Sequence, residues 1–163
     1  MVMQFGAQAA AARAHEELFA YWASRREGGR LPSRGAIRPE HFKRHLPMIS
    51  LIDVSPSPRA YRIRLAGTGL YGLYGREITG RTLEQVYPET AADYWRRELD
   101  QVVETRRPAV GMHSFAWRGA PHLSVLWLRL PLSADGAGVD MILGYDAPLG
   151  SRSDLHHSGI RAA

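Results

Sequence analysis

Two histidines of this chain have a spacing that could place metal ligands side by side. His41 and His45 are four residues apart, so both side chains would lie on one face of a helix. The segment lacks the glutamate of an HExxH zinc site, however, and Lys43 and Arg44 lie beside the histidines, where their positive charge opposes a cation. Exposed or capping histidines are the better interpretation, and we expect no metal site.

Residue types that catalyse hydrolysis or bind nucleotides are present, but no motif joins them. Ser114, His113 and Asp146 are the residues of a triad, yet no G-x-S-x-G motif surrounds the serine. The letters GTGLYG at 67–72 match G-x-G-x-x-G, but another glycine follows where a helix should continue. The absence of cysteine excludes thiolate catalysis, iron–sulfur clusters and cysteinyl zinc sites. We therefore expect a protein that is not an enzyme.

The segment 61–81, YRIRLAGTGLYGLYGREITGR, indicates the elements that position these residues. Its first residues alternate between apolar side chains and arginines: Tyr61, Ile63 and Leu65 against Arg62 and Arg64. Such alternation predicts a half-buried strand with the apolar residues on one face. Five glycines follow: Gly67, Gly69, Gly72, Gly75 and Gly80. They suit positive φ angles or close backbone approaches, and we expect a positive φ at Gly67 or Gly75.

Together with later motifs, this segment resembles a PAS domain, most closely the stand-alone bacterial PAS subfamily. The motifs are RLAGT at 64–68, GREITGR at 75–81 and LPLSADGAGVDMILG at 130–144. The resemblance covers residues 31–148 and implies an α+β fold, a five-stranded antiparallel sheet with helices on one face. A first strand is predicted at 48–54, and a short helix at 82–87 precedes a long one at 91–107 that Thr90 would cap.

The later strands are apolar on both faces, which predicts that they are buried on both sides. Val110 and Met112 are apolar in one strand, and Val125 to Leu128 form a continuous apolar run in the next. The chain then divides into an N-terminal amphipathic helix at 1–30, the PAS-like domain at 31–148 and a flexible tail at 149–163.

A stand-alone PAS domain implies a sensory or protein-interaction module of bacterial signal transduction, either gated by a small ligand or binding a signalling protein. In this fold a ligand would lie between the sheet and the long helix. The candidates to line that pocket are Tyr61, Tyr74, Tyr87, Trp95 and Met112, all of which could equally be plain core. The cofactor stays unknown. Light-sensing relatives form a flavin adduct through cysteine, which this chain lacks, and haem-binding relatives carry a histidine in the long helix, where this chain has none.

The N-terminal segment predicts an amphipathic helix over residues 7–26. His15, Leu18, Phe19 and Trp22 fall at i, i+3, i+4 and i+7 and form one apolar stripe. Either the sheet of the same molecule or the same helix of a second copy must cover this stripe. We expect it to be the interface of a homodimer.

The net charge of +5 and the pI of about 10.0 invite a nucleic-acid interpretation. The positive charge concentrates only at residues 25–44, where the single aromatic residue is Phe42 and no base-stacking series is present. A solvated face or a docking site for an acidic partner therefore fits better than a nucleic-acid adaptor. No segment is apolar enough to span a membrane, and we expect a cytoplasmic protein.

Overall fold

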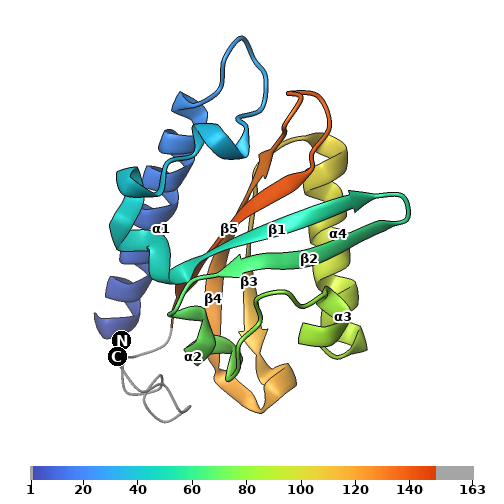
Figure 1. Cartoon of the computed structure of the whole chain (residues 1–163). Coiled ribbons are helices and arrows are strands. Elements are labelled where there is room, and N and C mark those ends of the chain that lie inside the picture. The colour runs from blue at the N-terminus through green and yellow to red at the C-terminus, as the bar shows by residue number, and fades with distance from the viewer. Residues whose placement is uncertain (1, 150–163) are drawn as a thin grey trace.

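The structure, a computed structural model, describes residues 2–149 and contains one antiparallel sheet with helices on both faces (Figure 1). Its helices are α1 (Val2–Ser24), α2 (Leu70–Tyr74), α3 (Leu83–Val86) and α4 (Glu89–Thr105), with 3₁₀ helices η1 (Arg34–Ala36), η2 (Pro39–Met48) and η3 (Ala116–Arg118). Its strands are β1 (Ile49–Pro56), β2 (Arg59–Ala66), β3 (Ala109–Phe115), β4 (Ala120–Leu132) and β5 (Met141–Pro148). The α+β fold with five strands and an N-terminal helix is therefore confirmed.

The strands lie in the order β2-β1-β5-β4-β3, so β2 and β3 are the two edges. The last three strands are neighbours, as the motif at 130–144 predicts, with Gly136 at φ 77° in the connection between β4 and β5. The alternation predicted for β2 holds for Tyr61 and Ile63 but fails at Leu65, which is 50% exposed. A register shift between Leu51 and Ile52 leaves one residue of β2 unpaired there, so the period of two is interrupted.

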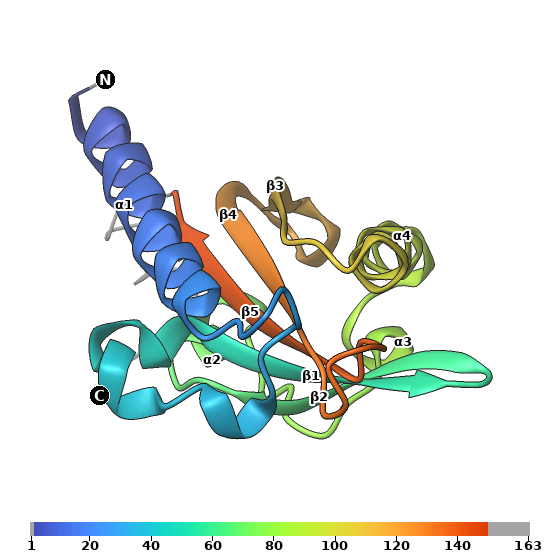
Figure 2. The same cartoon turned by 90° about the horizontal axis from the view of Figure 1, so that it is seen from above.

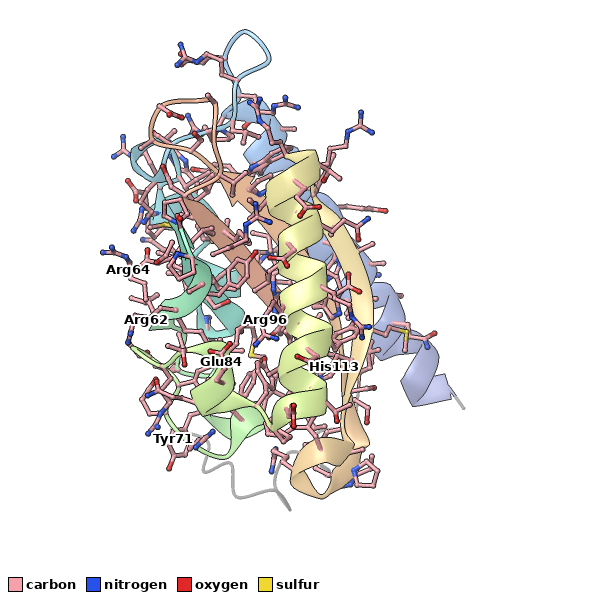
Figure 3. The ribbon with its side chains drawn as sticks, turned by 90° about the vertical axis from the view of Figure 1, so that its right-hand side faces the viewer. Arg62, Arg64, Tyr71, Glu84, Arg96 and His113 are labelled. Atoms are coloured by element: carbon pink, nitrogen blue, oxygen red, sulfur yellow. The ribbon has the colours of Figure 1, made fainter. Side chains whose placement is uncertain are left out.

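The inner face of the sheet is covered by α4, with α2 and α3 beside it (Figures 1 and 2). The helix α4 is amphipathic, and its buried residues are Ala91, Ala92, Trp95, Leu99 and Val102. It begins at Glu89 with Pro88 as N-cap, two residues earlier than a Thr90 cap would set it. Instead, Thr82 caps α3 in a reciprocal pair with Gln85. Figure 3 shows Glu84 of α3 beside Arg96 of α4, and their ion pair of 2.6 Å joins the two helices.

The outer face of β4 and β5 is covered by α1, on the opposite side of the sheet from α4 (Figure 2). Two side chains of α1 hydrogen-bond to the backbone of β4. Trp22 donates from Nε1 to the carbonyl of Pro131 at 2.9 Å, and His15 Nε2 lies 3.0 Å from the carbonyl of Leu126. The helix is therefore attached to its own sheet by both apolar packing and hydrogen bonds.

Two positions of the segment 61–81 require glycine for different structural reasons. Gly75 ends α2 with φ 72°, which confirms the predicted positive φ. Gly67 has no positive φ; instead, a Cβ at this position would collide with the carbonyl groups of Leu46 and Pro47. Gly67 therefore permits a close approach of two backbones.

The predicted tail at 149–163 lies outside the described residues except for Leu149, whose amide donates to the carbonyl of Ser124. Within residues 2–149, none of the helices combines the length and the apolar character that crossing a bilayer requires.

Candidate functional site

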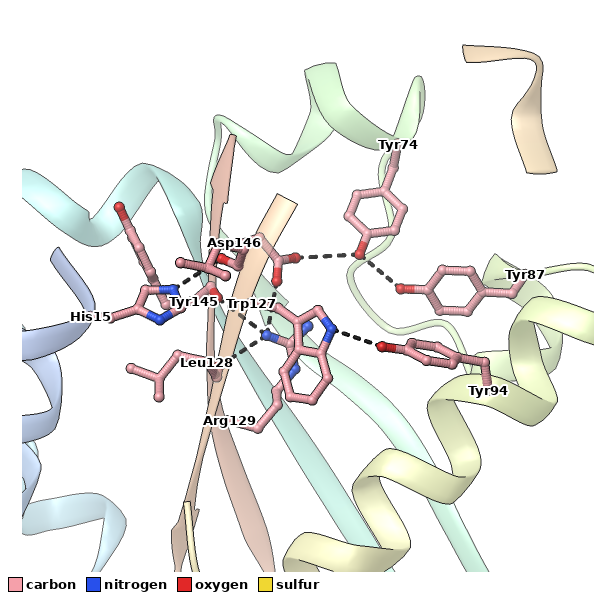
Figure 4. Close-up of polar contacts among 10 residues, drawn as sticks. His15, Tyr74, Tyr87, Tyr94, Trp127, Leu128, Arg129, Tyr145 and Asp146 are labelled. Carbon is pink, nitrogen blue, oxygen red and sulfur yellow. Dashed lines mark hydrogen bonds and ion pairs between the residues drawn. The ribbon is translucent and has the colours of Figure 1, made fainter. Parts of the chain in front are cut away.

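The inner face of the sheet contains a buried ion pair between two adjacent strands. Arg129 of β4 donates from Nη1 to Oδ1 of Asp146 on β5 at 2.8 Å, and each side chain is 3% exposed. The same nitrogen lies 3.0 Å from the carbonyl of Leu128 and 3.4 Å from that of Tyr145 (Figure 4). Gly144 provides the space, because a Cβ there would lie 3.2 Å from the guanidinium carbon. The strands thus hold a charged pair in the centre of the core.

Aromatic rings surround the guanidinium of Arg129. Its central carbon lies 4.6 Å from the ring centre of Trp95 on α4 and 5.7 Å from that of Trp127 on β4. Such stacking favours a desolvated cation. Burial alone would lower the pKa of Arg129, but Asp146 opposes this effect, and the resulting pKa is raised. The arginine therefore stays charged, and it can bind and orient but cannot exchange protons.

Two tyrosines extend the polar contacts from Asp146 toward the helices. Tyr74 of α2 donates from its hydroxyl to Oδ2 of Asp146 at 3.4 Å and lies 2.7 Å from the hydroxyl of Tyr87 (Figure 4). Burial raises the pKa of both hydroxyls above the ordinary value. Both phenols therefore stay protonated at neutral pH and act as hydrogen-bonding groups. The chemistry of this array is that of a fixed hydrogen-bond network.

The space beside this network is small. The cavity has a volume of about 20 Å³ and opens among residues of the sheet, α2, α3 and α4. Its lining includes Ser50, Tyr74, Tyr87, Trp95, Arg129 and Asp146. One water molecule needs a cavity of about 10–15 Å³. The cavity can therefore hold a water molecule but is too small for an organic ligand, unlike the pocket of a few hundred Å³ that a ligand-binding PAS fold would require.

The comparisons with known proteins decide the family. A family model described as PAS domain matches residues 10–146. The chain belongs to the PAS domain family. Membership of this family supports a role as a signal-sensing or interaction module. The search among curated proteins finds no matching sequence.

Solved structures with a similar shape carry the LOV name. A fungal LOV domain photoreceptor is 20% identical with a TM-score of 0.47, and the match covers 80% of this chain and 87% of that one. An RNA-binding Light-Oxygen-Voltage receptor is 17% identical with a TM-score of 0.48, covering 78% of this chain and 38% of that one. The Rhodobacter sphaeroides LOV protein is 15% identical with a TM-score of 0.46, and the match covers 78% and 86% of the two chains.

The structure brings three of the five predicted pocket residues of this PAS domain together. Tyr74, Tyr87 and Trp95 line the small cavity. Tyr61 also faces the inner side, but its hydroxyl donates to Asp100 of α4 at 2.5 Å, and it does not line the cavity. Whether any of these residues contacts a ligand stays a prediction.

Met112 does not face the interior, and its placement among the pocket residues is wrong. It is 60% exposed on the outer face of β3, as is Val110 at 62%, so this strand is not buried on both sides. The inner positions of β3 are Gly111 and His113. The ring of Trp127 occupies the space where a side chain at Gly111 would lie. Alternation in the strand therefore sends Met112 to the opposite face.

The predicted dimer stripe on α1 mostly packs within the PAS domain itself. His15, Leu18 and Trp22 are 8%, 1% and 2% exposed because they face β4 and β5. The prediction that these three residues form a dimer interface is therefore wrong, because they pack against the sheet of their own chain. Phe19 alone is 46% exposed. It lies on the flank of α1 that faces away from η2.

His41 and His45 are held by side chains of α1 and of Arg25, the residue after it, rather than by a common ligand. Nδ1 of His41 lies 3.0 Å from the hydroxyl of Tyr21 and 2.8 Å from Nη2 of Arg25, while Nε2 of His45 lies 2.8 Å from Oε2 of Glu17. Within residues 2–149, no group of three or more potential metal ligands is present.

Arg129 and its pairing with Asp146 were not predicted from the sequence. Arg129 stands alone in the apolar run of β4, and Asp146 stands alone in β5. A single charge inside a strand that is apolar on both sides is the signal that could have found them, because a buried charge requires a partner. His113 also belongs to the inner face, beside α4 (Figure 3), and its ring stacks on that of Tyr94 of α4 with ring centres 4.8 Å apart.

Proposed function

We propose that this PAS domain is a cytoplasmic protein-interaction module of bacterial signal transduction, without catalytic activity, and that it works as a homodimer. The observation that carries the proposal is the filled interior. A cavity of about 20 Å³ leaves no room for an organic signal, so the information that the domain transmits must lie on its surface.

The surface most suited to an interface is the outer face beside α1, which we call the outer apolar patch: Phe19, Val110 and Met112. All three side chains are at least 46% exposed. Val110 and Met112 pair across β3 and β4 with Leu128 and Leu126. Phe19 adds its ring from α1, which lies over the same face of β4. Exposed apolar side chains gathered on one face of a molecule are typical of interaction sites.

The occupant that we propose is a second copy of this chain, because only one of the two edges of the sheet is protected against pairing with another strand. The edge strand β2 carries three arginines, Arg59, Arg62 and Arg64, and a bridge from Arg62 to Thr82 covers part of it. Charged side chains of this kind block pairing with another sheet. The edge strand β3, AVGMHSF, has no Lys, Arg, Asp, Glu or Pro. Antiparallel pairing of β3 with its copy would be self-complementary and would bury the outer apolar patch.

Sedimentation velocity tests the proposal. We expect the purified chain to sediment as a dimer at micromolar concentration and the Met112→Glu variant as a monomer, because a charge would be buried without a partner. Since Met112 is exposed, this variant keeps the fold, which far-UV circular dichroism checks. The matched control is Gln101→Glu on the exposed face of α4. A monomeric wild type, or a dimeric Met112→Glu, would show the proposal to be wrong.

A second candidate, gating by a small molecule, is favoured by one observation on the inner face. Four buried nitrogen atoms there have no hydrogen-bond partner among the described residues: Trp95 Nε1, His113 Nε2, Trp117 Nε1 and Arg129 Nε. Buried donors normally have acceptors, and a bound molecule rich in acceptors would supply them if Tyr87 moved aside. Native mass spectrometry of the protein from its own host tests this candidate. A bound species that Trp95→Phe removes supports it, and apo mass alone counts against it.

A further inference from the structure

A groove with a surplus of positive charge lies between α1 and η2, away from the inner network and the outer apolar patch. It consists of two recesses of about 310 Å³ and about 470 Å³, which share Glu17, Arg44 and His45 in their lining. The first extends along α1 to Arg13, and the second extends to Lys43 of η2. We call the two together the α1–η2 groove.

A carboxylate already occupies the middle of this groove. Glu17 accepts a hydrogen bond from Arg44 and lies 2.8 Å from Nε2 of His45, which is buried. The hydrogen bond from Arg44 and then that from His45 lower the pKa of Glu17. Arg13 and Lys43, in contrast, have no acidic partner within salt-bridge distance among residues 2–149. The groove thus has three cationic side chains for one anionic one.

The walls of the groove hold their shape without a ligand. Leu18 of α1 is buried against the sheet, and Tyr21 packs on Phe42 of η2 with ring centres 5.3 Å apart. The hydroxyl of Tyr21 also accepts from the amide of Arg38 at 2.8 Å, which links the two helices. A rigid groove loses little conformational entropy when a ligand binds.

We propose that the α1–η2 groove binds an acidic segment of a partner protein, and that Glu17 acts as an internal competitor for the partner's carboxylate. The proposal rests on the assignment of the chain as an interaction module and names one of its partners by chemistry. A partner's Asp or Glu would take the position of Glu17 between Arg44 and His45, while Arg13 and Lys43 would attract flanking acids. The carboxylate geometry already present at Glu17 supports this choice of ligand.

An acidic peptide fits the groove better than a nucleic acid for two reasons. Arg44 and His45 together hold a single carboxylate, that of Glu17, whereas a phosphate backbone needs consecutive cations along its path. The rings of Tyr21 and Phe42 pack on each other, so they do not offer free faces on which bases could stack.

Fluorescence anisotropy with a fluorescein-labelled peptide of alternating glutamate and glycine tests the inference on the full chain. We expect Arg44→Gln to weaken binding about tenfold, because a charge-assisted hydrogen bond is lost. Arg97→Gln on the exposed face of α4 is the control for net charge and should leave binding unchanged.

The Glu17→Gln variant is the sharper test, because it should strengthen peptide binding about threefold or more by freeing Arg44 and His45. Glu16→Gln is its matched control, since Glu16 is the exposed neighbour on the other side of α1 and does not line the groove. If both variants strengthened peptide binding equally, the cause would be the change in net charge alone, and the inference would be wrong. Tighter binding of a labelled single-stranded DNA, weakened by Arg44→Gln, would also overturn it. Neither result depends on whether the chain sediments as a dimer, so failure here is distinguishable from failure of the proposed function.

Discussion

The buried pair of Arg129 and Asp146 predicts a large loss of stability when only one of its charges is removed. Asp146→Asn keeps the size of the side chain but leaves the guanidinium, which is 3% exposed, without a counter-ion. At 2.8 Å and an effective dielectric constant of about 20, the gross attraction between the two charges is about 6 kcal/mol. This attraction offsets the desolvation of both ions. We therefore expect Asp146→Asn to lower the free energy of unfolding by about 3–5 kcal/mol.

Removal of both charges should behave differently from removal of one. The double variant Arg129→Met, Asp146→Leu has no buried ion, so we expect its free energy of unfolding to lie close to that of the wild type or above it. Urea denaturation followed by far-UV circular dichroism measures both variants. A control comes from Arg64 and Asp53, whose ion pair has the same 2.8 Å distance but whose side chains are 60% and 29% exposed. There, Asp53→Asn should cost less than about 1 kcal/mol.

The comparison between the two ion pairs shows which results would contradict the role of burial. If Asp146→Asn costs no more than Asp53→Asn, burial does not control the strength of the inner network. If the double variant is as unstable as Asp146→Asn, the loss comes from packing around Trp95 and Trp127 rather than from an unpaired charge.

Three further predictions follow from single positions. Burial lowers the pKa of His15 and of His113, so below about pH 6.5 the native state binds fewer protons than the unfolded state. The free energy of unfolding should therefore fall as the pH decreases through about 6.5. The slope is at most about 1.4 kcal/mol per pH unit for each histidine. Urea titrations at several pH values measure this slope, and a slope that His15→Gln leaves unchanged would contradict the assignment. Gly75→Ala should lower the free energy of unfolding by about 1 kcal/mol, because the φ of Gly75 is 72°. Gly67→Ala should lower it more, because the new Cβ would displace the backbone of Leu46 and Pro47. Equal effects of the two substitutions in urea denaturation would count against this reasoning. At a concentration low enough to keep the chain monomeric, Met112→Trp should change the free energy of unfolding by less than about 0.5 kcal/mol, since the side chain is outside the core; a larger loss in the same assay would place it inside.

The sequence predicts the sheet well because its signals are local. The alternation at Tyr61 and Ile63 and the glycine that ends α2 depend on a few neighbouring residues, and the structure confirms them. The prediction fails at Leu65, because the extra residue in β2 is defined by its pairing with β1. A bulge of this kind depends on the partner strand, which a single segment does not encode by itself.

The inner site was less predictable, because it depends on which residues face each other across strands. Arg129 and Asp146 are 17 residues apart in the chain and meet only through the register of β4 and β5. Met112 and Gly111 show the same difficulty, since apolar character alone did not reveal which of the two faces α4. The closing of the pocket could not be predicted either, because it depends on how the rings of Tyr74, Tyr87 and Trp95, which come from different segments of the chain, pack on one another.

The two surfaces that we propose lie on opposite flanks of one helix, which makes their roles separable. Glu17 contacts Arg44 of η2, whereas Phe19, two residues later, is turned about 200° around the helix from it and is 46% exposed. Neither residue takes part in the hydrogen bond from Trp22 to Pro131, although the ring of Phe19 lies 5.9 Å from that of Trp22. We expect Phe19→Glu to weaken the dimer without changing the affinity for the acidic peptide, and Glu17→Gln to do the reverse. In the double variant the two effects should add, because the side chains share no partner. A change in peptide affinity on Phe19→Glu alone would mean that dimerisation and peptide binding are coupled through α1, and that the helix transmits a signal between the two surfaces.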